Sequence, residues 1–160
     1  MRRQPRTELL DELARVPLFA GLWRRDLLRV AAAVEVVDVD AGTEVVRQSD
    51  AGHDLYVVVQ GSATVVEDGR PAAMLGPGDT FGETGVFAGA RHPATVVAAD
   101  PLRLAVLGRR AAFGLLHVVP QLAPHLLRGM AARLGHRAET RVGAAARGGH
   151  SRPGRGRSTV

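Results

Sequence analysis

Hydrophobic and polar positions change period twice along this chain. Apolar side chains first recur every three or four positions, over residues 7–16 and 23–33, which predicts two helices. They then alternate with polar residues in short runs, and this pattern predicts β-strands. The helical period returns over residues 109–119 and 121–139. We therefore expect a mainly β protein, an antiparallel β-roll or jelly-roll barrel with N-terminal helices and two C-terminal helices.

The alternating region divides into short predicted strands that turn signals separate. The strongest of these signals is Asp68-Gly69, a dipeptide that favours a tight hairpin. In the helical part before the strands, Phe19 and Trp23 are expected to be ordinary packing residues. The predicted strands lie at residues 35–39, 43–47, 55–59, 63–67, 72–75, 95–99 and 102–107.

A glycine-rich stretch at residues 81–95 interrupts the strands and holds one carboxylate and one guanidinium. Small residues let backbone N–H groups approach an anion closely, as a phosphate cradle requires. Glu83 can accept hydrogen bonds from sugar hydroxyls, and Arg91 can fork onto phosphate oxygens. The stretch therefore indicates a sugar-phosphate site. The alternative is a plain glycine-rich loop between two strands.

The last predicted helix carries an apolar stripe that recurs every four residues. The stripe has three possible uses: packing against its own β domain, forming the seam of a homodimer, or covering a ligand. Its members are Leu122, Leu126, Met130 and Leu134.

Composition excludes several classes of function. The chain has no cysteine, which removes disulfides, thiolate metal sites and cysteine catalysis. The six histidines show no metal-ligand spacing, so we expect no metal site, no catalytic residues and no cofactor. No apolar run is long enough to span a bilayer and no secretion signal is present, so a cytoplasmic protein is expected.

Positive charge gathers at the C-terminal end. The net charge is +5, and the chain from residue 128 onward contains eight arginines but only one glutamate. Residues 139–160 are rich in Gly, Ala, Arg and Ser and are predicted to be disordered. Such a tail either aids solubility or holds an anionic surface by charge alone.

The order of elements and several short motifs resemble the cyclic nucleotide-binding domain family. The resemblance covers residues 13–134 and includes the run Gly-Pro-Gly-Asp at residues 76–79, followed by Phe-Gly-Glu at 81–83 and Ala-Thr-Val at 94–96. It also includes Pro-Leu-Phe-Ala-Gly-Leu at 17–22 and Gln-Gly at 60–61.

The resemblance implies a role for each matching residue of the stretch. The glutamate matching Glu83 holds the ribose 2′-hydroxyl, and an arginine three residues before Thr95 pairs with the cyclic phosphate. In this chain that position is His92, Arg91 precedes it, and Pro93 follows it without an N–H to donate. The expected ligand-binding residues are Gly82, Glu83, Thr84, Gly85, Arg91, His92, Ala94 and Thr95.

The resulting hypothesis is a non-enzymatic sensor. Residues 1–12 form a basic segment and the start of the first helix, residues 13–138 a cyclic nucleotide-binding-like domain, and residues 139–160 the tail. The domain would bind cAMP or cGMP through residues 81–95 and signal through its C-terminal helices. The alternative is a degenerate domain without ligand that acts as a dimerisation or protein-interaction scaffold. Specific DNA binding is not expected, because the tail has no apolar periodicity from which to build a helix-turn-helix.

Overall fold

The computed structural model describes residues 6–131 of the chain. It begins with α1 (Arg6–Arg15), which Val16 and Pro17 end. A single 3-10 turn, η1 (Pro17–Phe19), then leads to α2 (Arg24–Ala33). The buried apolar positions of these two helices are Leu10, Leu13, Leu27 and Val30, at the three-to-four spacing that predicted them.

Eight strands within the described residues form two four-stranded antiparallel sheets. The first has the order β1-β8-β3-β6 and the second the order β2-β7-β4-β5. The strands are β1 (Glu35–Val39), β2 (Glu44–Val46), β3 (Asp54–Gln60), β4 (Ala63–Glu67), β5 (Arg70–Leu75), β6 (Thr80–Phe81), β7 (Thr95–Ala98) and β8 (Leu102–Gly108). A short helix, α3 (Glu83–Ala88), interrupts them, and α4 (Arg109–Val118) follows β8.

Two hydrophobic clusters make up the interior. One lies between the first sheet and the helices and includes Phe19, Val57 and Leu126. The other lies between the two sheets and includes Phe81 and Leu104. Alternation along β3 and β8 sends their side chains to both clusters, which is why nearly all residues of these two strands are buried or half-buried.

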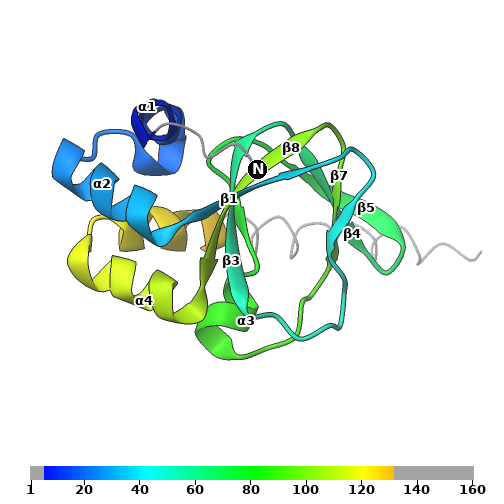
Figure 1. Cartoon of the computed structure of the whole chain (residues 1–160). Helices are drawn as coiled ribbons and strands as arrows, with labels where there is room; N and C mark the ends of the chain where they lie inside the picture. Colours follow the sequence, from blue (N-terminus) through cyan, green and yellow to red (C-terminus); the bar gives the residue numbers. More distant parts are fainter. Residues whose placement is uncertain (1–5, 132–160) are drawn as a thin grey trace, which may run out of the picture.

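The helices α1, α2 and α4 gather on one side of the β structure, the left side in Figure 1, and α3 lies at its lower edge. Arg29 of α2 bonds the buried carboxylate of Asp26 at 3.0 Å and donates to the carbonyl of Val118, at 3.3 Å, in the last turn of α4. A further helix begins at residue 122 and is described to residue 131. We call this segment the C-terminal helix.

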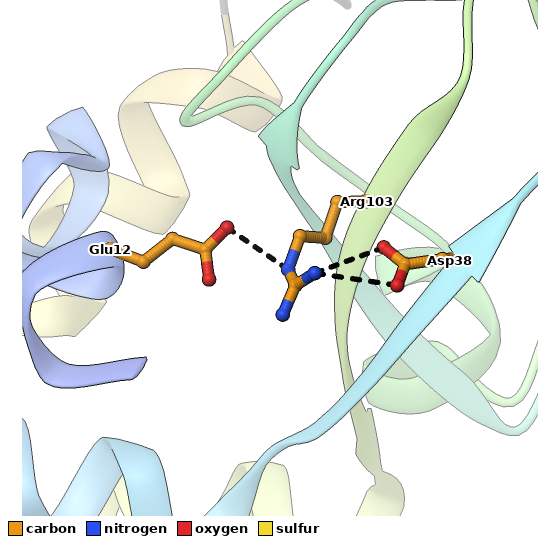
Figure 2. A network of polar contacts seen from close by, with 3 residues as sticks. All are labelled: Glu12, Asp38 and Arg103. Atoms are coloured by element: carbon orange, nitrogen blue, oxygen red, sulfur yellow. Dashed lines mark hydrogen bonds and ion pairs between the residues drawn. The ribbon is translucent and has the colours of Figure 1, made fainter. Parts of the chain in front are cut away.

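An ion-pair network joins α1 to the first sheet (Figure 2). The Nε of Arg103 on β8 lies 2.9 Å from Oε1 of Glu12 on α1. The Nη1 of the same guanidinium lies 3.3 Å from both carboxylate oxygens of Asp38 on β1. One arginine therefore links the N-terminal helix to two neighbouring strands.

The structure confirms the mainly β fold with flanking helices and corrects two details of it. The strands do not close into a barrel but form two separate sheets. The glycine-rich stretch is not all loop, because it contains the last residue of β6, the helix α3, and Arg91, which forms an isolated bridge with Ala51. Glycines at 82, 85 and 89 concealed α3 from the pattern, since glycine is a poor helix former.

Trp23 was wrongly expected to pack inside. Its side chain is 72% exposed and it precedes the first turn of α2, whereas Phe19 is buried as expected. The predictions for Leu134 and for the tail at 139–160 fall outside the described residues. Within residues 6–131, no helix is long and apolar enough to cross a membrane.

Candidate functional site

A cavity of about 110 Å³ opens between the second sheet, the glycine-rich stretch and the C-terminal helix. Such a volume holds several water molecules or part of a small organic ligand. Its walls are largely apolar, with few polar groups. The lining residues are Val46, Val65, Leu75, Phe81, Gly82, Glu83, Thr84, His92, Pro93, Ala94, Val96 and Met130.

Glu83 reaches the cavity because of the tight turn before it. Gly82 has a φ of 83°, in the left-handed region that favours glycine, and is the N-cap of α3. A side chain on residue 82 would collide with the backbone oxygen of Asp54 on β3. The bare glycine therefore lets α3 begin directly against the sheet, with the buried carboxylate of Glu83 at its first position.

His92 also lines the cavity and is also buried. Its backbone N–H donates to the carbonyl of Asp50 at 2.9 Å, and its own carbonyl accepts from the N–H of Ser49 at 2.8 Å. Its ring rests on Gly52, where an added Cβ would come within 2.6 Å of Cε1. Both the backbone and the ring of His92 are thus held in place by residues 49–52.

Arg91 takes a different direction. Its side chain is exposed, does not line the cavity, and donates from Nη1 to the carbonyl of Ser49 at 2.9 Å. Arg91 pairs with Ala51 in an isolated antiparallel bridge, and neighbouring residues of extended chain point to opposite sides. The one-residue offset between Arg91 and His92 therefore decides which side chain faces the cavity.

Some of the remaining predicted residues line the cavity, and the others make contacts that support its walls. Thr84 and Ala94 line the cavity, but Gly85 packs against the backbone of Gly52. The hydroxyl of Thr95 accepts a hydrogen bond from the N–H of Gln48 at 3.0 Å.

Gln48 also ties this segment to the hairpin between β4 and β5. Its amide nitrogen donates to Asp68 Oδ1, and its amide oxygen accepts from the N–H of Asp68, both at 2.9 Å. The loop around His92 is therefore braced against the second sheet.

Among the described residues, Glu83 and His92 are the ionisable side chains of the cavity lining. Burial lowers the pKa of His92 below its ordinary value. The carboxylates of Asp50 and Glu83 act in the opposite direction, and His53 lowers the pKa further. The cavity therefore holds one carboxylate and an imidazole that is mainly neutral at neutral pH. Within residues 6–131 there is no cluster of three or more side chains suited to hold a metal.

Two features of the lining were not predicted from the sequence. Val46, Val65, Leu75 and Val96 form its apolar walls. Each lies in a predicted strand but also has an apolar neighbour, so the alternation alone could not tell which side chains face the cavity. Met130 was expected only as part of the apolar stripe. Leu122 and Leu126 of that stripe pack into the protein's own core, and Met130 extends it to the cavity.

Comparisons with known proteins agree with this arrangement. The family model of the cyclic nucleotide-binding domain matches residues 36–117, just over half of the chain. The cAMP-dependent protein kinase regulatory subunit of Schizosaccharomyces pombe is 34% identical over 102 residues, which is 63% of this chain but 24% of that protein.

Solved structures share the fold. The catabolite activator protein of Thermus thermophilus is 27% identical, with a TM-score of 0.68 over 81% of this chain and 63% of its own. The cAMP-bound PfPKA-R fragment 141–441 is 20% identical, with a TM-score of 0.75 over 84% of this chain and 47% of its own. This chain thus spans a quarter of its curated relative and about half to two thirds of these structures. From the family match and the shared fold together, the chain belongs to the cyclic nucleotide-binding domain family.

Proposed function

We propose that this chain is a regulatory module that binds a cyclic nucleotide, cAMP or cGMP, in the cavity beside α3. The observation that carries the proposal is the position of Glu83. It places a buried carboxylate on the wall of an otherwise apolar cavity, where a sugar hydroxyl can donate to it. The matching position in the family resemblance is the ribose contact. The expected ligand-binding residues that line the cavity, Gly82, Thr84, His92 and Ala94, complete the proposed site.

The signal would leave through the C-terminal helix. Met130 lines the cavity, and Leu126 on the same helix is buried in the core with α1, α2 and α4. A ligand that contacts Met130 changes the packing of a helix that already belongs to that core. A second contact runs from α3 to α4, where the rings of Phe87 and Phe113 meet edge to face at 5.4 Å. Both contacts support coupling between ligand and helices.

Several further expectations belong to the same proposal. Regulatory subunits and sensor domains are not catalytic, and we propose that this chain likewise performs no catalysis and needs no resident cofactor or metal. Intramolecular burial of Leu122 and Leu126 accounts for most of the described part of the apolar stripe, so we propose packing and covering of the ligand as its roles ahead of a homodimer seam. A cytoplasmic location and the absence of specific DNA binding remain predictions from the sequence.

Calorimetric titration of cAMP and cGMP into the full chain tests the proposal, with Glu83→Gln as the variant. The matched control is Glu35→Gln, because Glu35 is an exposed glutamate on β1 and does not line the cavity. Loss of the hydrogen bonds to a charged acceptor is expected to weaken binding by about tenfold or more in Glu83→Gln only. The absence of heat with either nucleotide, at both neutral and mildly acidic pH, would contradict the proposal.

A ligand-free scaffold is the second candidate, and one observation favours it. The guanidinium of Arg91 lies outside the cavity, bonded to Ser49, and Pro93 has no N–H for a phosphate. A scaffold of this kind would melt at the same temperature with and without nucleotide. A rise in melting temperature that is specific to a cyclic nucleotide would argue against it.

A further inference from the structure

We infer that His92, and not Arg91, is the side chain that faces the phosphate of the ligand, and that the nucleotide therefore binds together with a proton. The inference rests on the proposed function and adds to it the identity of the phosphate contact and its regulation by pH. It follows from where the two side chains lie, from the backbone around them, and from the charges of the cavity.

The side chains of Arg91 and His92 point in fixed and different directions. His92 lines the cavity and Arg91 lies outside it, on opposite sides of one extended segment. To exchange them, the chain would have to break the two backbone hydrogen bonds between His92 and residues 49 and 50. It would also have to move the bond from Gln48 to Thr95. The hydrogen bond from Nη1 of Arg91 to the carbonyl of Ser49 holds the guanidinium at this position outside the cavity.

Few hydrogen-bond donors beside His92 remain for a phosphate. The N–H of His92 is occupied by the carbonyl of Asp50, and Pro93 has none. Neither residue offers a backbone donor to a phosphate from this part of the lining. The hydroxyl of Thr84 and the imidazole of His92 are the side-chain donors of the described lining, and of these two only the imidazole can carry a positive charge.

The charges in the cavity favour a protonated His92 once a phosphate is bound. A cyclic phosphate stays an anion throughout the pH range in which a histidine titrates, and Glu83 already gives the cavity a negative charge. The groups that face His92 are Asp50 from the segment before β3, Glu83 from α3, and His53. A neutral imidazole would leave the phosphate without a positive partner in this lining, whereas a protonated imidazole supplies one with a charge-assisted hydrogen bond.

Proton binding and ligand binding are linked at His92. In the empty cavity, burial holds the pKa of His92 below its usual value, so the ring is mainly neutral. A phosphate placed beside the ring favours the charged form and raises that pKa. Binding then takes up a proton, and the observed affinity increases as the pH falls, by at most about tenfold per pH unit between the two pKa values.

The experiment is calorimetric titration of cAMP into the full chain between about pH 8 and pH 5.5, the range in which a histidine changes charge. Each titration is repeated in two buffers of different ionisation enthalpy, so that proton uptake is counted directly. We expect up to one proton per nucleotide and an affinity that increases by about tenfold or more over this range.

Three variants assign the effect to one side chain. His92→Gln is expected to keep the weak binding of high pH and lose the pH dependence. His92→Arg supplies a permanent positive charge and is expected to bind with little pH dependence, at least as tightly as the parent at low pH. Arg91→Ala is the matched control, because it removes a neighbouring cation outside the cavity, and it is expected to keep the full pH dependence. Thermal melting of each variant without ligand confirms that it folds.

The outcomes separate the inference from the proposed function. Binding that depends on Glu83 but not on pH, or binding that is lost in Arg91→Ala, overturns the inference and leaves the function standing. If neither the parent at any pH nor His92→Arg binds a cyclic nucleotide, the proposed function itself fails, and the inference fails with it.

Discussion

The ring of His92 lies against Gly52 so closely that a Cβ on residue 52 would come within 2.6 Å of Cε1 and 2.8 Å of Nε2. The imidazole of His92 thus packs directly on the backbone of Gly52. Real Cβ contacts are not this short, and the ring is enclosed rather than free to swing into solvent. Gly52→Ala is therefore expected to displace the ring and weaken binding of cAMP at acidic pH by about tenfold.

The control for that substitution is Gly114→Ala. Gly114 lies inside α4 with open space where its Cβ would be, so alanine there is expected to stabilise the fold by about 0.5–1 kcal/mol and leave nucleotide affinity unchanged. Calorimetry for affinity and urea denaturation for stability distinguish the two effects. Equal affinity in Gly52→Ala and the parent would show that the position of the ring does not matter for binding.

Without ligand, the stability of the protein is expected to respond to pH in the opposite sense to the affinity. Burial lowers the pKa of His92 in the folded state, so below the ordinary histidine pKa of about 6.5 the unfolded chain binds more protons than the folded one. The contribution of His92 to stability is therefore fully present above that pH and is lost as the pH falls toward the lower folded pKa. Urea denaturation of the parent and His92→Gln across this range measures it. The variant should lose less stability on acidification, and parallel curves for the two proteins would contradict the assignment.

The ion-pair network of Arg103 provides a test of how α1 is held. Glu12 and Asp38 pair with the same guanidinium, but the side chain of Glu12 is 11% exposed and that of Asp38 is 71% exposed. Glu12→Gln is expected to reduce the free energy of unfolding by about 1–3 kcal/mol, because it takes the charge from a mostly buried pair. Asp38→Asn is expected to cost less than about 1 kcal/mol, since water screens an exposed pair. An equal loss of unfolding free energy in the two variants would mean that the burial of each carboxylate does not determine how much its ion pair stabilises the fold.

Two neighbouring leucines of the C-terminal helix differ in burial, and their alanine variants can be compared. Leu126 is 6% exposed and packs in the main core, whereas Leu127 is 64% exposed. Leu126→Ala is expected to cost about 2–5 kcal/mol of stability, and Leu127→Ala less than about 0.5 kcal/mol. Denaturation at several protein concentrations completes the test. A midpoint that increases with concentration, together with a large effect of Leu127→Ala, would favour a homodimer seam over intramolecular packing.

The sequence predicted most elements because the periods of two and of three to four residues are unambiguous where one face of an element is buried. The strands at 35–39 and 63–67 match β1 and β4 residue for residue. The prediction failed for α3, where glycines at 82, 85 and 89 conceal a helix whose formation depends on close contact with Gly52 and Asp54. The strand predicted at 72–75 is also shorter than β5, because proline at position 71 is typical of a strand end. Pro71 nevertheless lies within β5, at an edge of the sheet, where proline is tolerated.

The sequence predicted which residues form the candidate site but not which way their side chains point. The sequence placed Glu83, Arg91 and His92 in one stretch, but it did not say which of the two neighbouring side chains, Arg91 or His92, faces inward. That choice depends on the bridge between Ala51 and Arg91, a long-range pairing that no local pattern encodes. Likewise, Met130 belongs to a regular apolar stripe, and only the folded chain shows that this position meets the cavity.

A crystal structure of the chain with cAMP at mildly acidic pH, about 5.5, where a histidine is largely charged, measures the central claim most directly. We expect the nucleotide in the cavity beside α3, with a ribose hydroxyl on the carboxylate of Glu83, the phosphate against the ring of His92, and Met130 in contact with the ligand. A nucleotide bound at the exposed guanidinium of Arg91, or a cavity that stays empty at saturating cAMP, would contradict the account.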